Sequence, residues 1–271
     1  MGKVITLGLQ KGGVSKTTTT GILTYLLAED GYKVLAVDMD SQGNLTELLT
    51  DQSANEFFER SVFEAIAYKK PKEYIYKLNE NIDILPANNF LASYARWLYT
   101  EYIPHTTEGE VKAPYEGLEV NQLNLTLELI KDEYDYIVID TPPALGEQTT
   151  NALVASDYVI VLFEASKFCY SAIPNFMETV LHVQQINDLE VLGMLRTLND
   201  VRRKDALLFN ELIKDDYPEL VFETIITRRA SVGRLPIRGF EDNPELEEAL
   251  KQFRSFYKEL LERLKEGDRD E

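Results

Sequence analysis

Cysteine and histidine are scarce in this sequence of 271 residues. The single cysteine, Cys169, excludes an intrachain disulfide and is typical of a reducing compartment. It also excludes a metal or iron–sulfur site that needs several cysteines from one chain. The two histidines, His105 and His182, are isolated in the sequence and need no catalytic role.

The sequence also lacks an export signal and a membrane-spanning segment. Residues Lys3 to Leu7 are too few and too interrupted for the core of a signal peptide, and the longest apolar runs, such as 159–163, have the length of a strand. We therefore expect a soluble, cytoplasmic protein. The net charge of −18 disfavours non-specific nucleic-acid binding by the surface as a whole, because an acidic surface repels phosphates.

What the sequence does contain is an almost regular alternation of strand-like and helix-like segments. Strands are expected at 4–9, 32–37, 82–86, 136–140, 158–163, 191–195 and 221–226, and helices at 17–29, 45–50, 62–67, 88–102, 118–132, 148–155, 171–185, 204–214 and 244–266. This alternation predicts an α/β fold with a doubly wound, mostly parallel central sheet flanked by helices. We expect a single domain over 1–271, with a loop or insertion at 103–118. The aromatic stretch 90–115 is interpreted as core and lid.

A phosphate-binding loop is predicted between the first strand and the first helix. Residues Gly8 to Thr18 read GLQKGGVSKTT, and a helix follows. In such a loop the backbone N–H groups and the helix N-terminus face the phosphates, Lys16 reaches the outer phosphates, and Thr17 can ligate Mg²⁺. The match to G-x-x-x-x-G-K-[ST] is imperfect, since Gln10 and Ser15 stand where the pattern has glycine. On the loop alone, a turn that binds nothing stays open.

Two acidic motifs follow strands and are expected at the same edge of the sheet, because ligands bind outside the carboxyl ends of parallel strands. Asp38 and Asp40 end the second strand, and Asp140 ends the strand at 136–140. An aspartate at this position beside a phosphate loop holds Mg²⁺ directly or through water. We therefore predict Thr17, Asp38 and Asp140 on the metal side, and Asp40 as the catalytic residue that orients and polarises the attacking water.

Lys11 is a second lysine that an ordinary phosphate loop does not require. Since Gly12 and Gly13 follow it, we expect its side chain to project away from its own loop and to reach a nucleotide on another subunit. A solvated lysine on a turn is the alternative when Lys11 is taken in isolation.

Three segments together resemble the ParA/MinD family of deviant-Walker ATPases: QKGGVSKTT at 10–18, VDMDSQGNLT at 37–46 and IDTPPALG at 139–146. The resemblance covers essentially the whole chain and is strongest to the short ParA-type DNA-partition ATPases. It implies ATP and Mg²⁺ as cofactors, slow ATP hydrolysis, and an ATP-driven homodimer in which Lys11 crosses to the partner's nucleotide. It further implies non-specific binding of double-stranded DNA, a centromere-binding, ParB-like adaptor that stimulates hydrolysis, no membrane partner, and a nucleoid-associated location.

The predicted nucleotide-binding residues are Lys11, Gly12, Gly13, Val14, Ser15, Lys16, Thr17, Thr18 and Asn199. Asn199 is included because it follows a strand where the family contacts the adenine base. The family usually has glycine at position 15 and proline at position 41, and this chain has Ser15 and Ser41. If residue 15 needs a positive φ, serine costs roughly 1–2 kcal/mol there. A nucleotide-gated scaffold with weakened hydrolysis is therefore an alternative.

A basic segment in the C-terminal third is the predicted DNA contact. Residues 224–240 contain four arginines and no acidic residue, and a second basic cluster lies at 202–204. The predicted DNA-binding residues are Arg202, Arg203, Arg228, Arg229, Arg234 and Arg238. Before the resemblance is considered, a solvated loop whose arginines pair with Glu241 and Asp242 is an equal alternative.

Two other functions compete with DNA partition. A membrane-cycling, MinD-like function requires a C-terminal amphipathic helix with a cationic face. The helix expected at 244–266 is predominantly acidic outside its apolar side, so we expect it to pack against its own domain. A cofactor-assembly enzyme of the nitrogenase-reductase type needs two cysteines per subunit, and this chain has Cys169 alone.

Overall fold

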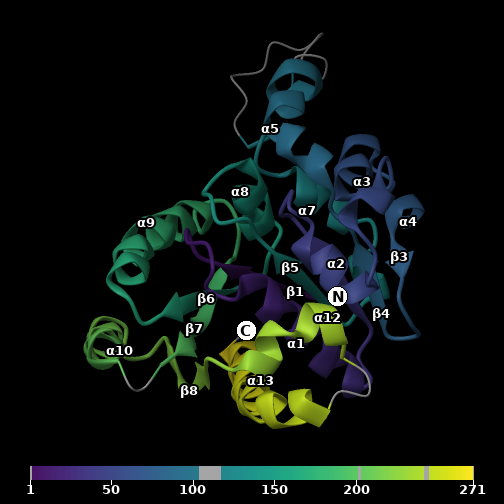
Figure 1. Ribbon diagram of the computed structural model, residues 1–271. Helices are drawn as coiled ribbons and strands as arrows, with labels where there is room; N and C mark the ends of the chain where they lie inside the picture. Colours follow the sequence, from purple (N-terminus) through teal and green to yellow (C-terminus); the bar gives the residue numbers. More distant parts are fainter. Residues whose placement is uncertain (1, 104–116, 201–202, 241–243, 271) are drawn as a thin grey trace.

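The computed structural model describes residues 2–103, 117–200, 203–240 and 244–270, and its centre is an eight-stranded sheet (Figure 1). The strand order is β3-β4-β2-β5-β1-β6-β7-β8, and all neighbours are parallel except the edge pair β3 and β4. The strands are β1 (Lys3–Gly8), β2 (Val34–Asp38), β3 (Tyr76–Lys77), β4 (Ile82–Leu85), β5 (Tyr136–Asp140), β6 (Tyr158–Glu164), β7 (Glu190–Asn199) and β8 (Val221–Thr227). The predicted fold class, a doubly wound and mostly parallel sheet, is confirmed.

Helices cover both faces of this sheet (Figure 1). Helices α1 (Lys16–Glu29) and α13 (Pro244–Asp270) pack on one face, and α3 (Val62–Tyr68), α7 (Gln122–Leu127) and α8 (Glu147–Val154) pack on the other. The remaining elements are α2 (Asn44–Thr50), α4 (Pro71–Tyr74), α5 (Tyr94–Trp97), α9 (Lys167–Val183), α10 (Lys204–Asp216), α11 (Ala230–Gly233), α12 (Leu235–Arg238), the 3₁₀ turns η1 (Ala54–Phe57), η2 (Asn89–Ser93) and η4 (Lys131–Glu133), and the π turn η3 (Leu98–Tyr102).

The central strands are mostly apolar and almost fully buried because helices cover both faces of the sheet. Successive side chains of a strand point to opposite faces. In β1, Ile5 and Leu7 therefore join the core that includes α1 and α13, whereas Val4 joins the core that includes α3 and α7. The two cores lie on opposite faces of the sheet, and its carboxyl edge faces the loop that precedes α1.

Three predicted helices differ from the observed ones. Helix α9 begins at Lys167 because the side chain of Ser166 caps it by accepting a hydrogen bond from the Cys169 N–H, so Pro174 lies inside the helix and not in its first turn. The expected helix 88–102 is a succession of η2, α5 and η3, and the expected helix 118–132 contains only α7 and η4. Most of the insertion expected at 103–118 lies outside the described residues, and the single domain over 1–271 stays a prediction.

Helix α13 packs against its own domain, as its sequence predicts. Its apolar side chains are buried against β7, β8 and α1, and Arg263 donates hydrogen bonds to the carbonyls of Leu192, Leu220 and Val221. Within the described residues, none of the helices combines the length and the apolar character that crossing a bilayer requires.

Gly43 has a tight position in the turn between β2 and α2. Its φ is +65°, and a Cβ added there would lie 2.4 Å from the Cβ of Ala54. We predict that Gly43→Ala lowers the free energy of unfolding by about 2–4 kcal/mol, because overpacking adds to the strain of a positive φ.

Gly31→Ala is the control, since Gly31 has a φ of +89° but open space around the added atom. It should cost only about 1–2 kcal/mol. Equal losses in urea unfolding would contradict this explanation.

Candidate nucleotide-binding site

The loop between β1 and α1 presents a series of unpaired backbone donors. The N–H groups of residues 12–18 donate no backbone hydrogen bond within the described part of the chain, and α1 begins inside this stretch at Lys16. Gly13 and Ser15 both have a left-handed backbone, with φ of 76° and 68°. Consecutive free N–H groups at a helix N-terminus bind anions such as phosphate.

Ser15 has a positive φ, as expected for a position where the family usually has glycine. A non-glycine residue in this conformation costs roughly 1–2 kcal/mol. The Ser15 side chain makes no capping hydrogen bond to α1 that would offset the cost. The strain therefore lies in the middle of the phosphate-binding loop.

Lys16 is held in the loop by its own backbone. Its Nζ donates hydrogen bonds to the carbonyl of Lys11 at 2.8 Å and to that of Leu9 at 3.4 Å. Burial lowers the pKa of Lys16, and the carboxylates of Asp140 and Asp40 partly offset this effect. The loop thus carries one buried cation beside its free N–H groups.

Two buried aspartates lie side by side at the ends of β2 and β5. Asp38 and Asp140 are neighbours in the register of these strands, and both side chains are fully buried. Burial raises the pKa of Asp38 to about 7 and that of Asp140 to about 8. Repulsion from Asp38 raises the pKa of Asp140 further, so the site carries more negative charge than its environment favours.

Asp140 and Thr17 fit a magnesium ion. The Thr17 hydroxyl donates to Oδ2 of Asp140 at 2.6 Å, and the buried Oδ1 has no hydrogen-bond partner among the described residues. No group of three or more His, Cys, Asp or Glu side chains suited to a metal lies in the described chain. A magnesium ion here would take further oxygens from phosphate and water, as this ion commonly does.

Asp38, also predicted on the metal side, is engaged by the protein itself. Its carboxylate accepts hydrogen bonds from the Asp40 N–H at 3.1 Å, the Thr46 N–H at 2.9 Å and the Thr46 hydroxyl at 2.8 Å. These bonds fix the backbone at Asp40, whose own Oδ1 accepts from the Gln42 N–H at 3.0 Å. Metal binding by Asp38 and catalysis by Asp40 stay predictions.

A cavity of about 480 Å³ opens beside the loop. It is lined by Gly12, Gly13, Ser15, Lys16, Thr17, Thr18, Asp40, Gln42, Asn44, Glu47, Leu48, Thr141, Pro143 and Pro236. Among the predicted nucleotide-binding residues, Val14 is buried beneath the loop, and Lys11 and Asn199 do not line the cavity. Asn199 is buried, and its side-chain oxygen accepts a hydrogen bond from Asn210 at 3.1 Å.

Several lining residues were not predicted. Gln42, Asn44, Thr141 and Pro143 lie inside the segments 37–46 and 139–146, so the motifs contained the signal. Pro236 lies on α12 within the arginine-rich segment, and no motif pointed to it.

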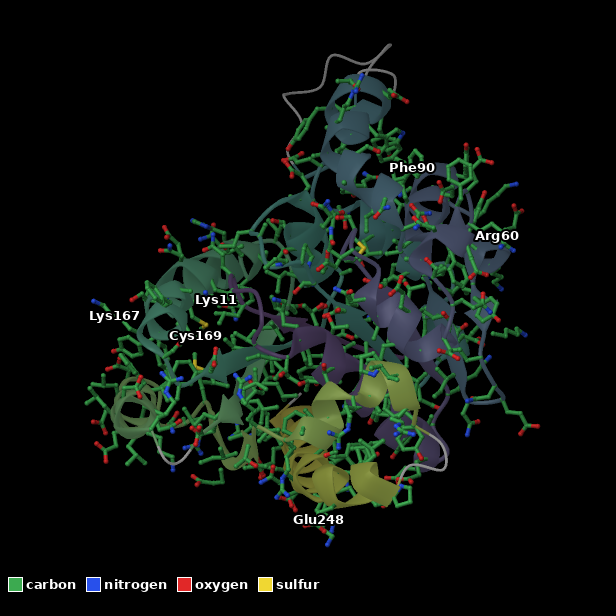
Figure 2. All side chains as sticks on the ribbon, in the orientation of Figure 1. Lys11, Arg60, Phe90, Lys167, Cys169 and Glu248 are labelled. Carbon is green, nitrogen blue, oxygen red and sulfur yellow. The ribbon has the colours of Figure 1, made fainter. Side chains whose placement is uncertain are left out.

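Lys11 points away from the cavity that its neighbours line. Its Nζ lies 5.7 Å from the centroid of the Phe168 ring at the start of α9, and Figure 2 shows Lys11 near this end of the helix, where Lys167 and Cys169 are labelled. Phe168 is 75% exposed, and a cation–π contact at an exposed site is weak, about 0.5–1 kcal/mol. The expected projection of Lys11 away from its own loop is therefore observed. Its contact with a second nucleotide stays a prediction.

The arginines predicted to bind DNA lie at the surface beyond β7 and β8. Arg203, Arg228, Arg229, Arg234 and Arg238 are exposed. Arg228 pairs with Glu164 at 3.3 Å and Arg203 pairs with Asp205. Arg202 lies outside the described residues, as do Glu241 and Asp242, the acidic partners of the alternative interpretation. DNA binding by these arginines stays a prediction.

Comparisons with known proteins agree with the three motifs. A family model described as an AAA domain matches residues 2–191. The sporulation initiation inhibitor protein Soj of Bacillus subtilis is 35% identical over 243 residues, which cover 88% of this chain and 89% of Soj. The chain belongs to the ParA/MinD family of ATPases. The segments that carry the ParA/MinD resemblance supply every lining residue of the cavity except Glu47, Leu48 and Pro236.

A second relative and a solved structure are similar to this ParA/MinD-family chain over most of its residues. The chromosome partitioning protein ParA of Myxococcus xanthus is 30% identical over 88% of this chain and 80% of that protein. The crystal structure of cobyrinic acid a,c-diamide synthase from Mycobacterium smegmatis, with a bound ATP analogue and magnesium, has a TM-score of 0.80 at 30% identity. It covers 98% of this chain and 97% of the synthase.

We predict that the protein without nucleotide and magnesium loses stability between pH 5 and pH 8. The pKa values of Asp38 and Asp140 are raised to about 7 and 8, so the native state binds more protons than the unfolded state in this range. The free energy of unfolding then falls as the pH rises. Asp140→Asn should raise it at pH 8 by about 1–3 kcal/mol and change it little at pH 5.

Urea unfolding at the two pH values tests this prediction, with the exposed Asp188→Asn as the control. The control should keep the pH dependence of the unchanged protein. Stability that rises from pH 5 to pH 8, or the same pH dependence in Asp140→Asn, would show that the buried aspartates are already ionised.

Proposed function

We propose that the protein is a DNA-partition ATPase that works as an ATP-bound homodimer. This dimer binds double-stranded DNA without sequence preference, and an adaptor that stimulates hydrolysis releases it. The observation that carries the proposal is the direction of the Lys11 side chain. It points toward Phe168 and away from the cavity that Lys16, Thr17 and Asp40 line. The names of the relatives Soj and ParA support partition as the purpose of the cycle.

In this proposal the phosphate loop and four side chains near the cavity have separate tasks in addition to Lys16. The free N–H groups of the loop and Lys16 hold the phosphates, and Thr17 and Asp140 would hold magnesium, which neutralises phosphate charge when bound. Hydrolysis of a phosphoanhydride requires a positioned water and fixed positive charge at the transferred group. Asp40 positions the water because Asp38 fixes its backbone, and Lys11 of the second subunit supplies the positive charge.

The position of Pro236 supports a link between nucleotide and DNA. This residue lines the cavity and belongs to the short helix α12, which ends at the exposed Arg238. Exposed Arg229 and Arg234 precede the same helix. In this proposal, α12 is the short element that connects the nucleotide cavity with the basic surface.

DNA binding measured with ATP, with ADP and without nucleotide, across a salt series, tests the proposal. We expect binding that requires ATP and falls steeply with salt, because phosphate contacts release counterions. A variant with Arg229→Ala and Arg238→Ala should bind more weakly, with a salt slope shallower by about 2 per protomer. Arg60→Ala, an exposed arginine far from this surface (Figure 2), is the control.

Two results would contradict partition. Binding that is independent of nucleotide, or equal in the double variant and the control, would exclude the proposed DNA surface. ATP-dependent binding to lipid vesicles in place of DNA would favour the membrane-cycling alternative, although the apolar face of α13 is already buried in the protein.

Ser15 decides between a working ATPase and a nucleotide-gated scaffold. We predict that Ser15→Gly raises ATP turnover, because glycine removes the backbone strain and the Cβ from the phosphate loop. Relief of roughly 1 kcal/mol at the transition state corresponds to about a fivefold increase. Ser15→Ala keeps the Cβ and the strain, so it should match the unchanged protein. The turnover of the unchanged protein and of both variants is measured as phosphate release with DNA present. If Ser15→Gly has the same turnover and the same ATP affinity as the unchanged protein, the strain has no role.

A further inference from the structure

A cavity formed only by aromatic and acidic side chains lies away from the nucleotide site. We call it the cation pocket, and it has a volume of about 490 Å³. Its lining residues are Phe58, Glu59, Glu64, Tyr68, Tyr74 and Phe90. Figure 2 shows Phe90 on the upper right of the molecule, whereas Lys11 lies on the left.

The aromatic rings of the cation pocket are held by one another and remain open to solvent. Phe58 and Phe90 form an edge-to-face pair with centroids 4.9 Å apart, and Tyr68 stacks on Tyr74 at 6.3 Å. Phe58, Tyr68 and Phe90 are 50%, 64% and 51% exposed. Exposed aromatic side chains that gather in one place are typical of a binding surface, whereas single exposed ones scattered over a surface are normal.

The carboxylates of the cation pocket have capacity for a further cation. Glu59 makes no hydrogen bond or ion pair with the part of the chain that the structure describes. Glu64 uses Oε2 to accept hydrogen bonds from the Ser61 N–H and hydroxyl. Desolvation, with help from the carboxylates of Glu73 and Glu64, raises the pKa of Tyr74, which agrees with a negative potential at this place.

The cations nearest in sequence are engaged outside the pocket. Arg60 donates to the carbonyl of Glu56, Lys69 to the Gln122 carbonyl and the Thr126 hydroxyl, Lys70 pairs with Glu73, and Lys72 pairs with Glu133. None of these four side chains lines the cation pocket. The cation pocket itself is therefore lined by aromatic and acidic side chains without a basic one among the described residues.

A second cavity continues the first along α3 and α5. It has a volume of about 500 Å³ and shares Glu64 and Tyr68 with the cation pocket. Its other lining residues are Phe63, Ala67, Ser93, Arg96, Trp97 and Glu101. The two cavities adjoin at Glu64 and Tyr68, and we refer to them together as the groove. A segment of chain can contact both cavities at once, whereas a small ion occupies only one of them.

We propose that this groove binds a basic segment of a partner protein, with an arginine or lysine side chain inserted between the rings of the cation pocket. Aromatic faces attract a cation through their quadrupole, and the attraction grows where the cation is partly desolvated. Within the cation pocket, Glu59 and Glu64 add charge complementarity, which favours a basic side chain there, whereas the adjoining cavity has one charge of each sign, Arg96 and Glu101. The site does not depend on the proposed ATPase cycle, because none of its residues lines the nucleotide cavity.

The only tryptophan of the chain, Trp97, makes the groove directly observable. It lines the second cavity, so its fluorescence reports on this groove and not on other acidic surfaces. The full chain is titrated with a short peptide of alternating arginine and leucine, which contains no tryptophan. We expect a saturable change in Trp97 fluorescence, and no change with the same peptide carrying glutamate in place of arginine.

Three variants test which residues carry the binding. Phe90→Ala should raise the dissociation constant of the basic peptide about tenfold by removing one wall of the pocket. Glu59→Gln should raise it about threefold, since this exposed carboxylate caps no helix. Glu219→Gln, an exposed glutamate outside both cavities, should leave it unchanged. ATP turnover should be the same in all three variants, so failure here would be distinct from failure of the proposed ATPase.

Several results would overturn the proposal. They are no change in Trp97 fluorescence with the basic peptide, equal dissociation constants in all variants, or binding of the acidic peptide with the same affinity. Guanidinium chloride that reproduces the fluorescence change at the same arginine-equivalent concentration would show a site for a free small cation. Sedimentation showing self-association that Phe90→Ala abolishes would assign the groove to a second copy of this chain.

Discussion

The site depends on buried charge at the carboxyl edge of three adjacent strands. Because β2, β5 and β1 are neighbours in the sheet, Asp38, Asp140 and the loop with Lys16 must lie together. Burial raises the pKa values of both aspartates, and repulsion between carboxylates adds to this effect, because one buried ammonium does not balance two buried carboxylates. A cation held by Asp140 and Thr17 would remove this excess of negative charge. Nucleotide–metal binding and folding stability are therefore linked through the same two side chains.

The sequence was sufficient to predict the central strands and the residues at their ends. Continuous apolar runs that stop at Asp38 and Asp140 identify buried parallel strands, and the alternation with helices predicts a doubly wound sheet. The order of the strands in the sheet came from the structure alone. The strain at Ser15 could be anticipated, because glycine is the residue that tolerates its φ. The start of α9 was missed because the cap at Ser166 outweighs the signal of Pro174. The contribution of Pro236 was missed because it depends on how a distant segment folds back over the cavity.

Side-chain environment was harder to predict than strand position. The aromatic stretch 90–115 was interpreted as core and lid, and the core part is correct for Tyr94 and Leu98, which are fully buried. The lid stays a prediction, since residues 104–115 lie outside the described part of the chain. Phe90 instead meets Phe58 at the surface, a contact between segments that are separated by two helices and two strands. Similarly, the glycines after Lys11 predicted that its side chain leaves the loop, but the sequence contained no sign that Phe168 would receive it.

A nucleotide site completed by a second subunit is the central claim, and mixing two inactive variants tests it most directly. Lys11→Ala and Asp40→Ala should each lose ATP turnover when assayed alone. In a mixed dimer, the Asp40→Ala subunit supplies Lys11 to the intact Asp40 of its partner, so one of two sites is complete. An equal mixture should therefore recover about a quarter of the turnover of the unchanged protein. No recovery in the mixture, with both variants folded and able to bind ATP, would show that Lys11 acts on its own nucleotide.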